Sequence, residues 1–263
     1  MLNRFCAVSF LALLTRATST NNYTCPQHLY SVQIFSEDPL IIYIPGFLTE
    51  TEAQHLESIS SGRFTSSQIA DQSGQQHLAS TRTSRSTSLN SDEVVRCIEE
   101  RALQFQGYDI PRTHLEPLQA VQYSLGETYA PHTDWFTSSL QTTPEYGGNR
   151  LSSFFVYIST SDDIVGGGTQ FPLLDAPKDE RWCAFVNCDA GWENGVTFRP
   201  IARNAVFWRN LRGGNAGKGR VGDRRTLHSG LPVQRGKKLG MNIWTREAEL
   251  DVMYRSEVPT HDH

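Results

Sequence analysis

Residues 123–134 read YSLGETYAPHTD, and the stretch ends in an H-x-D pattern formed by His132 and Asp134. Side chains alternate along a strand with a period of two, so on a strand both residues of this pair would face the same side. His228, far along the chain, can supply a third ligand from another strand. Two imidazoles and one carboxylate would bind one face of a metal ion and leave the opposite positions open.

An H-x-D pattern alone is weak evidence, because it also fits a hydrogen-bonded surface turn. Lys238 strengthens it, since Pro232 and Gly236 favour a turn between His228 and Lys238 that would direct this lysine inward. A buried ammonium group needs an anionic partner. A dicarboxylate bound at one end to an Fe(II) ion of the non-haem oxygenase type would supply that partner. Otherwise Lys238 is a solvated strand residue beside Lys237.

The apolar runs predict a mixed α+β fold. Thr49 and Ser91 are expected to cap two helices, at 50–58 and from Ser91 to about residue 105, and a strand at 40–44 precedes the first. The later runs are short, strand-like and separated by turns, which favours two stacked β-sheets over a parallel α/β sheet. These runs are 118–124, 151–159, 182–186, 205–208 and 239–244. We therefore expect a β jelly roll supported by two N-terminal helices.

Three motifs, in order along the chain, resemble the prolyl 4-hydroxylases of the Fe(II)/2-oxoglutarate-dependent dioxygenase superfamily. They are the stretch 123–134, GGTQFP at 167–172, and FWRNL at 207–211 followed by HSGLPV at 228–233, GKK at 236–238 and Trp244. The resemblance implies a double-stranded β-helix, which is a jelly-roll variant, over residues 38–247. It also implies Fe(II), 2-oxoglutarate and O2 as cofactor and cosubstrates, with ascorbate as reductant.

The resemblance implies roles for seven residues at the metal and the cosubstrate: His132, Asp134, His228, Lys238, Tyr123, Thr169 and Trp244. The first three would be the iron ligands, and Lys238 would bind the distal carboxylate of 2-oxoglutarate. Tyr123 is similar to a tyrosine that hydrogen-bonds the cosubstrate, Thr169 to a threonine of that pocket, and Trp244 to a nearby aromatic residue. Without the resemblance, Tyr123 and Trp244 are core aromatics and Thr169 is a β-branched strand residue.

Two arginines are similar to positions associated with the substrate. Arg150 matches an arginine associated with the peptide substrate, although an arginine at the start of a strand can simply be solvated. Arg246 departs from the family pattern, because members that act on peptidyl proline commonly carry histidine there. A guanidinium group at this position suits a carboxylate or a stacked ring. This departure puts specificity for peptidyl proline in question and leaves the iron chemistry intact.

The ends of the chain indicate the secretory pathway, either the endoplasmic reticulum lumen or secretion. Residues 1–19 resemble a cleaved signal peptide, followed by a polar segment at 20–37, the dioxygenase domain at 38–247 and a tail at 248–263. Asn22 begins an N-glycosylation sequon. Outside the signal there are four cysteines at 25, 97, 183 and 188, which allow three disulfide pairings. The last two are close enough to face each other across a tight loop.

Composition excludes several classes of protein. The chain has 24 Lys+Arg against 28 Asp+Glu, a net charge of −4, which argues against nucleic-acid binding. Its 38% hydrophobic content excludes intrinsic disorder. No apolar run is long enough to span a membrane stably. A glycine-rich basic segment at 209–225 is expected to be a flexible loop, with a lid over a neighbouring site as the functional alternative.

Three functions compete at this stage. The first is a luminal prolyl 4-hydroxylase acting on a peptide or protein. The second uses the same iron chemistry on a small molecule or a biosynthetic peptide, and Arg246 favours it. The third is a catalytically silent binding module that keeps only the fold. Retention of all three candidate ligands together with Lys238 counts against the third. The need for a partner subunit stays open.

Overall fold

The computed structural model describes residues 24–71, 75–107, 109–213 and 219–255. Its largest element is an eight-stranded antiparallel sheet in the order β1-β2-β13-β9-β18-β7-β6-β3. The strands are β1 (Gln33–Glu37), β2 (Leu40–Ile44), β13 (Ala205–Arg209), β9 (Arg150–Thr160), β18 (Lys238–Arg246), β7 (Gln119–Tyr123), β6 (Arg85–Ser88) and β3 (Thr65–Ser66). The predicted runs around 118–124, 151–159, 205–208 and 239–244 all form central strands of this sheet.

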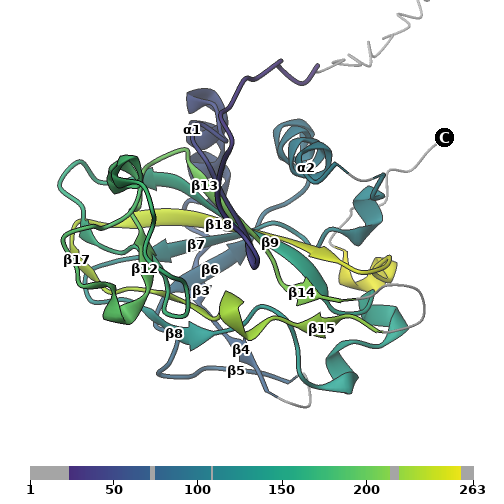
Figure 1. The fold of residues 1–263 in the computed structure, drawn as a ribbon. Coiled ribbons are helices and arrows are strands. Elements are labelled where there is room, and N and C mark those ends of the chain that lie inside the picture. Colours follow the sequence, from purple (N-terminus) through teal and green to yellow (C-terminus); the bar gives the residue numbers. More distant parts are fainter. Residues whose placement is uncertain (1–23, 72–74, 108, 214–218, 256–263) are drawn as a thin grey trace, which may run out of the picture.

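A smaller four-stranded sheet faces the large one, in the order β12-β11-β16-β8. It contains β12 (Val196–Phe198), β11 (Thr169–Phe171), β16 (His228–Gly230) and β8 (Tyr129–His132). Three two-stranded ribbons complete the β structure: β10 (Val165–Gly166) with β17 (Val233–Arg235), β14 (Leu211–Arg212) with β15 (Val221–Gly222), and β4 (Ile69–Ala70) with β5 (Gln76–His77). Two stacked antiparallel sheets confirm the predicted double-stranded β-helix of the jelly-roll type (Figure 1).

Both helices, α1 (Glu50–Ser60) and α2 (Glu93–Phe105), lie on the face of the large sheet that points away from the small one (Figure 1). Thr49 caps α1 as predicted, because its hydroxyl accepts from the Glu52 N–H at 3.1 Å while the Glu52 carboxylate accepts from the Thr49 N–H at 2.8 Å. The predicted cap of α2 was wrong by one residue. Asp92 caps it, and Ser91 instead accepts a hydrogen bond from Arg112 at 2.9 Å.

Two hydrophobic cores follow from this layering. Apolar side chains of both helices pack on one face of the large sheet, where the aromatic rings of Phe47, Phe154 and Phe207 are buried. The other face packs against the small sheet through a second set of large residues, including Tyr157 and Trp208. Because period-two alternation sends neighbouring residues of β9 and β13 to opposite faces, one strand serves both cores. The central strands are therefore fixed on two sides.

The strand predicted at 182–186 is wrong, because most of this run forms a short 3-10 helix, η4 (Glu180–Ala184). Asp179 caps it by accepting from the Arg181 N–H at 2.9 Å. In this turn Trp182 and Phe185, three residues apart, both reach the core: Trp182 lies 4.9 Å from the ring of Phe35. A disulfide between Cys183 and Cys188 then closes the loop, which leaves no room for an extended strand.

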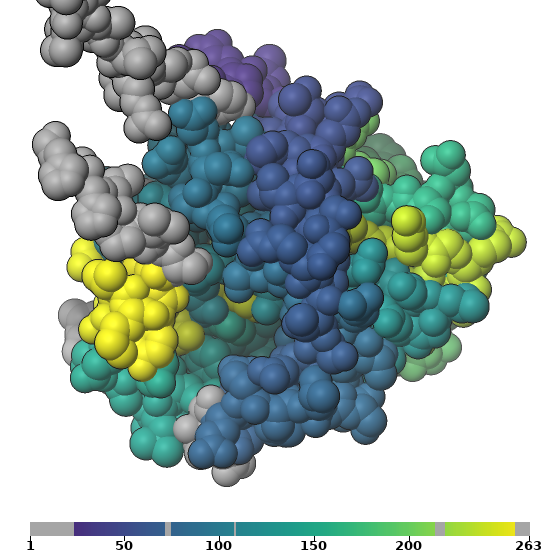
Figure 2. All heavy atoms as spheres, turned by 180° about the vertical axis from the view of Figure 1, so that it is seen from behind, coloured from purple at the N-terminus to yellow at the C-terminus, as the bar shows by residue number. Residues whose placement is uncertain are grey.

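Six further 3-10 turns connect the strands, and several border the site described below. They are η1 (Arg112–His114), η2 (Ser139–Gln141), η3 (Pro144–Tyr146), η5 (Trp192–Asn194), η6 (Arg224–Thr226) and η7 (Val252–Tyr254). Seen from behind, the surface is hollowed between the segment near residue 250 (yellow) and the blue segment of the first hundred residues (Figure 2). The turn η7 packs on η3, where the rings of Tyr254 and Tyr146 lie 4.5 Å apart.

A second disulfide joins Cys25 to Cys97 and ties the start of the described chain to α2. The predicted signal at 1–19 and Asn22 lie outside the described residues. In the part of the chain that the structure covers, no helix combines the length and apolar character needed to cross a bilayer. Within the glycine-rich segment at 209–225, the ends form the β14–β15 ribbon, and residues 214–218 lie outside the described part.

Candidate metal centre

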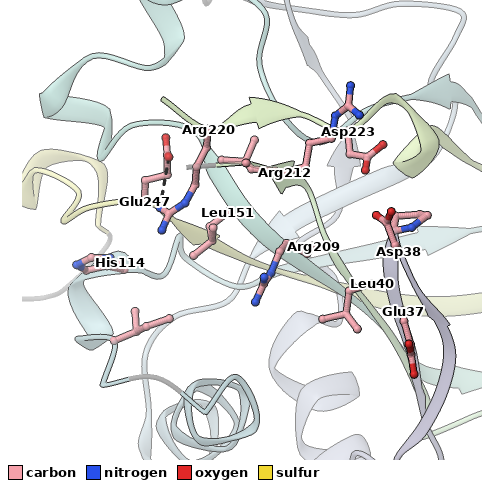
Figure 3. Close-up of a pocket in the computed structure, with 14 residues that line it drawn as sticks. Glu37, Asp38, Leu40, His114, Leu151, Arg209, Arg212, Arg220, Asp223 and Glu247 are labelled. Atoms are coloured by element: carbon pink, nitrogen blue, oxygen red, sulfur yellow. Dashed lines mark ion pairs between the residues drawn. The ribbon is translucent and has the colours of Figure 1, made fainter. Parts of the chain in front are cut away.

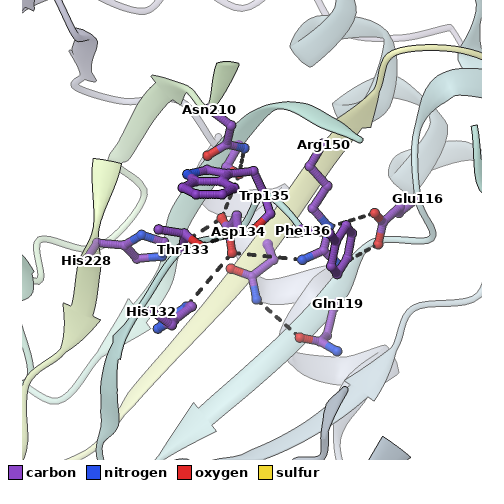
Figure 4. Close-up of polar contacts among 12 residues, drawn as sticks. Glu116, Gln119, His132, Thr133, Asp134, Trp135, Phe136, Arg150, Asn210 and His228 are labelled. Atoms are coloured by element: carbon purple, nitrogen blue, oxygen red, sulfur yellow. Dashed lines mark hydrogen bonds and ion pairs between the residues drawn. The ribbon is translucent and has the colours of Figure 1, made fainter. Parts of the chain in front are cut away.

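Strands β8 and β16 bring His132 and His228 directly opposite each other, because these two residues are paired in the antiparallel register. Each imidazole Nε2 lies 3.9 Å from an oxygen of the Asp134 carboxylate. One ligand atom from each residue falls within 4.8 Å of the others. The three candidate ligands predicted from the sequence therefore converge on one point (Figure 4).

Asp134 does not share a strand with His132, contrary to the prediction. Strand β8 ends at His132, and Asp134 lies in the bend that follows it. The bend is held from outside, because Trp135 donates its indole N–H to the Asp223 carbonyl at 3.2 Å. The face of the same ring covers Gly222, where a Cβ would come within 2.1 Å of the indole. A turn rather than strand alternation thus directs Asp134 toward the two imidazoles.

The tautomer of both histidines follows from their backbone contacts. Nδ1 of His132 lies 2.9 Å from the carbonyl of Ala130, and Nδ1 of His228 lies 3.0 Å from the carbonyl of Thr226. A carbonyl can only accept, so each Nδ1 carries the proton and each Nε2 keeps a free lone pair. This arrangement is typical of metal-binding histidines, whose second nitrogen is fixed by an outer partner. The donor set suits a divalent transition metal.

Burial and neighbouring charges set the protonation states of His132 and Asp134. Burial, together with the nearby His228, lowers the pKa of His132 to about 3, so this ring is neutral at pH 7. Burial alone would raise the pKa of Asp134, but attraction to His228 and Arg150 outweighs it and lowers the pKa to about 2. At neutral pH the site therefore presents an ionised carboxylate and a neutral imidazole, the forms that bind metal ions.

The ring of His132 is also fixed from the side, by residues that the sequence reasoning missed. Tyr129 stacks on it with the ring centroids 3.6 Å apart and the planes at 19°. The guanidinium of Arg82 lies over the ring of Tyr129, 4.7 Å from its centroid. Tyr129 belongs to the quoted stretch, but a spacing of three along a strand predicts opposite faces, so the sequence pattern gave no sign of this contact. Arg82 gave no signal either, since it comes from a distant loop.

Lys238 begins β18 and points inward, as predicted, with 1% of its surface exposed. Its ammonium group donates to the carbonyl of Gly167 and lies 4.3 Å from the centroid of Tyr123, its partner across β7. Among the described residues, no carboxylate forms an ion pair with it. Burial consequently lowers the pKa of Lys238 to about 7. A buried ammonium group without a protein anion is suited to receive one from a ligand.

Tyr123 and Thr169 lie close to Lys238, in the space between the two sheets. Burial raises the pKa of Tyr123 to about 12, so it is a neutral hydrogen-bonding group. Thr169 is buried, and its hydroxyl accepts from Tyr157 at 2.7 Å. Tyr157 also lies 5.9 Å from the Lys238 ammonium, which links Thr169 to the same neighbourhood. Lys238, Tyr123 and Thr169, three of the four residues predicted to bind the cosubstrate, thus share one compartment.

Arg150 and Arg246 are held by one acidic residue, Glu116, that the sequence reasoning missed. Arg150 forms two hydrogen bonds to this carboxylate, at 2.7 and 2.8 Å, and Arg246 forms another at 2.6 Å. Burial alone would raise the pKa of Glu116, but the two guanidinium groups outweigh it and lower the pKa. A lone Glu before Pro117 carries no local pattern, so its role could not be read from the sequence.

The guanidinium of Arg150 also stacks 3.7 Å from the ring of Trp244 and lies 3.9 Å from the Asp134 carboxylate. This places Trp244 and Arg150 beside the candidate metal ligands. Arg246 also donates to the carbonyl of Gly148 at 2.8 Å. Its side chain is 7% exposed. The donor fork predicted to receive a substrate carboxylate is thus already engaged by Glu116.

A pocket of about 460 Å³ opens at another place, where the end of β13 and the β14–β15 ribbon meet the loop before η1 (Figure 3). Its charged walls are largely paired internally: Arg220 lies 3.5 Å from Glu247, and Asp223 lies 2.6 Å from Arg225, just outside the lining. None of the nine residues predicted for the site lines this pocket. It is therefore distinct from the candidate metal centre.

Comparison with known proteins adds independent findings. The sequence profile of the 2OG-Fe(II) oxygenase superfamily matches residues 118–246. Prolyl 4-hydroxylase 5 of Arabidopsis thaliana is 31% identical over 226 residues, which cover 84% of this chain and 73% of the relative. Probable prolyl 4-hydroxylase 8 of the same plant is 30% identical over 219 residues, covering 81% and 70%.

Among solved structures, the viral collagen prolyl hydroxylase of Paramecium bursaria Chlorella virus-1 superposes with a TM-score of 0.53. The match covers 78% of this chain and 94% of that one, at 22% sequence identity. At this level of identity the likeness supports the fold. It agrees with the two stacked sheets described above.

Proposed function

The chain belongs to the prolyl 4-hydroxylase-like family of the 2OG-Fe(II) oxygenase superfamily, and from this premise we propose that it hydroxylates prolyl residues of a peptide or protein. The activity is that of a 2-oxoglutarate-dependent dioxygenase, with Fe(II), 2-oxoglutarate and O2. The observation that carries the assignment to this site is the convergence of His132, Asp134 and His228 within 4.8 Å. Ascorbate is proposed as the reductant that keeps the iron ferrous.

We assign the three converging residues as the iron ligands. Their donor set fits the group, because two neutral imidazole nitrogens and one carboxylate oxygen are the facial ligands of non-haem Fe(II) oxygenases. When bound, the iron supplies the oxidative chemistry that inserts oxygen into a C–H bond. The chain's own residues hold their donors in place: the Ala130 and Thr226 carbonyls fix the two imidazoles.

We assign Lys238 as the residue that binds the distal carboxylate of 2-oxoglutarate. Its ammonium group is buried without a protein carboxylate, so a dianionic cosubstrate would restore charge balance. Tyr123 and Thr169, in the same compartment, are proposed to complete the pocket through their hydroxyl groups. An apolar surround strengthens such an ion pair, since little water is present to screen it.

Arg150 and Arg246 are proposed to form the substrate side of the centre, with Trp244 as the aromatic residue near the cosubstrate. The Arg150 guanidinium stacks on the Trp244 ring at 3.7 Å and lies 3.9 Å from the Asp134 carboxylate. Arg246 contributes by fixing Glu116 and through it Arg150. This role would account for an arginine where the family commonly has histidine.

We also propose that the protein acts in the secretory pathway, in the endoplasmic reticulum lumen or outside the cell. Two disulfides, Cys25–Cys97 and Cys183–Cys188, support this, since such bonds form and persist in oxidising compartments. The residues at 1–19 that resemble a signal and the sequon at Asn22 agree with it. Residues 20–37, 38–247 and 248–263 are then proposed as the leading segment, the catalytic domain and the tail.

The test is turnover by the full chain with Fe(II), ascorbate and 2-oxoglutarate, with and without a proline-rich peptide. We expect succinate to form in step with one added oxygen atom per hydroxylated proline, measured by mass spectrometry. Succinate without a modified peptide would indicate a small-molecule or other substrate, and no succinate would indicate a silent binding module. In the matched variants His132→Ala and Lys238→Met, coupled product should be lost.

A further inference from the structure

A buried chain of hydrogen bonds ends on the carboxylate of Asp134. Ser153 Oγ donates to Asp134 Oδ2 at 2.6 Å, and Asn210 Nδ2 donates to Ser153 Oγ at 2.9 Å (Figure 4). Ser153 and Asn210 are both 0% exposed. The direction of each bond is fixed by chemistry: an ionised carboxylate only accepts, so the serine proton points to Asp134 and its lone pair is left for the amide.

Rigid parts of the fold carry both members of this chain. Ser153 lies on the central strand β9, and Asn210 links β13 to β14. The backbone of Asn210 is held on both sides, because its N–H donates to the Leu151 carbonyl at 2.9 Å and its carbonyl accepts from the Asp223 N–H at 2.8 Å. The amide is therefore placed independently of the hydroxyl that it contacts.

Asn210 occupies this position at a cost to folding. Its Oδ1 atom is buried and has no hydrogen-bond partner among the described residues. An unsatisfied buried acceptor typically destabilises a protein, whereas an apolar side chain of similar shape would avoid the penalty. Its Nδ2 atom, by contrast, donates to Ser153 Oγ. Such an arrangement is typical of a functional contact rather than of core packing.

Ser153 lies within hydrogen-bonding distance of the Asp134 carboxylate, whereas Arg150 and the two imidazoles each lie 3.9 Å from it. Arg150 lies 3.9 Å from Oδ1, which supplies charge but leaves the rotation of the carboxylate free. The short bond from Ser153 restricts that rotation. A facial metal site needs its single carboxylate in one orientation so that the remaining positions stay open.

We propose that Ser153 and Asn210 are positioning residues for the metal ligand Asp134. Asn210 orients the Ser153 hydroxyl, and Ser153 holds the carboxylate in the rotation that faces both imidazoles. This inference rests on the proposed function, because it takes Asp134 as an iron ligand. Loss of an outer partner of a metal ligand typically weakens metal binding 10- to 100-fold.

The experiment is an anaerobic titration of the full chain with Mn(II) alone, followed by calorimetry or by Mn(II) electron paramagnetic resonance. We expect Ser153→Ala to raise the Kd for Mn(II) by about 10- to 100-fold. The matched control is Ser152→Ala. Ser152 is the next residue on β9, is 2% exposed, and donates to Gln106 Oε1 at 2.7 Å, in place of a metal ligand. The Ser152→Ala variant should lose about as much stability as Ser153→Ala and keep the Kd for Mn(II) within about twofold of the wild-type value.

A double-mutant cycle then tests the order of the chain. Asn210→Ala should weaken Mn(II) binding in the wild-type background and have no further effect in the Ser153→Ala background, because Asn210 acts through Ser153. Ser153→Cys retains the size and a weak donor, so it should give an intermediate Kd. It also replaces Ser153→Ala in the cycle if the alanine variant does not fold.

The outcomes are distinct. Wild-type Mn(II) affinity in Ser153→Ala, an equal loss in Ser152→Ala, or additive effects of the two positions would each overturn the inference while leaving the proposed function in place. A wild-type chain that binds no Mn(II) would overturn both. A loss confined to Ser153 and Asn210, with the non-additivity described, supports the positioning role.

Discussion

Replacing Lys238 by methionine should make the protein more stable and unable to use its cosubstrate. The ammonium group is 1% exposed, and burial lowers its pKa from the usual 10.5 to about 7. At 1.36 kcal/mol per pKa unit, the charged form costs the apo fold up to about 5 kcal/mol below pH 7. Methionine keeps the length of the chain without the charge. Loss of the bond to Gly167 and of the contact with Tyr123 reduces the gain.

We therefore expect a net stabilisation of about 2 kcal/mol in the protein without metal or 2-oxoglutarate at pH 6, or a rise in Tm of about 4–8 °C. The gain should shrink as pH rises. An unfolded lysine stays protonated up to pH 10.5, whereas the folded one loses its proton above about pH 7. Between these values the unfolded state binds more protons, so the stability of the wild type increases with pH and approaches that of the variant.

The assay is urea unfolding of both proteins at a series of pH values from 6 to 9, with Lys237→Met as the matched control. Lys237 is the neighbouring lysine and is exposed, so its replacement should change stability by less than about 0.5 kcal/mol at every pH. In parallel, Lys238→Met should lose at least about 30-fold in affinity for 2-oxoglutarate, which corresponds to about 2 kcal/mol. A variant that is less stable at pH 6, or a gap that is independent of pH, would refute the reasoning.

Three further predictions concern separate parts of the molecule. A bound dianion keeps Lys238 protonated, so the affinity for 2-oxoglutarate should be constant below pH 7 and fall by up to tenfold per pH unit above it. Calorimetry in two buffers should show proton uptake on binding. Unchanged affinity at pH 9 would argue against this. Glu116→Gln leaves the guanidinium groups of Arg150 and Arg246 buried without their shared anion. Urea unfolding should show that the free energy of unfolding falls by about 3–5 kcal/mol. A fall of less than about 1 kcal/mol would mean that water replaces the carboxylate. Thr49→Ala removes the cap of α1 and should cost about 1 kcal/mol with kcat unchanged, so a fall in kcat would contradict the separation of this helix from the site.

The parts of the fold that the sequence predicted are those with a strong local pattern. The runs that became β7, β9, β13 and β18 are long and apolar enough to identify buried strands. Thr49 and Glu52 form a capping box within four residues, so the start of α1 could be read directly. The run at 182–186 was wrongly predicted as a strand, because Trp182 and Phe185 are as apolar as strand residues. The sequence pattern also did not show that a disulfide bends this loop into a 3-10 turn.

In the candidate site, too, some residues could be predicted from the sequence and others could not. His132, Asp134, His228 and Lys238 have chemistry that demands a partner, so their types and order predicted the convergence of the first three and the burial of Lys238. Residues that only contact these four, such as Ser153, have side chains that do not by themselves indicate a functional partner.

Ser153 is the instructive case, because it and Ser152 are two hydroxyl groups in an otherwise apolar strand, LSSFFVYI at 151–158. Burying a hydroxyl requires a hydrogen bond, which signals that a partner exists without naming it. Only the three-dimensional register separates the serine that reaches Asp134 from the one that reaches Gln106. Long-range pairing of this kind has no local sequence pattern.

The most direct test of the central claim is anomalous diffraction from a crystal of the protein soaked anaerobically with Mn(II). The account predicts one strong peak per chain, at bonding distance from His132 Nε2, His228 Nε2 and a carboxylate oxygen of Asp134. No peak at this point, or a peak elsewhere with these three side chains turned apart, would contradict it.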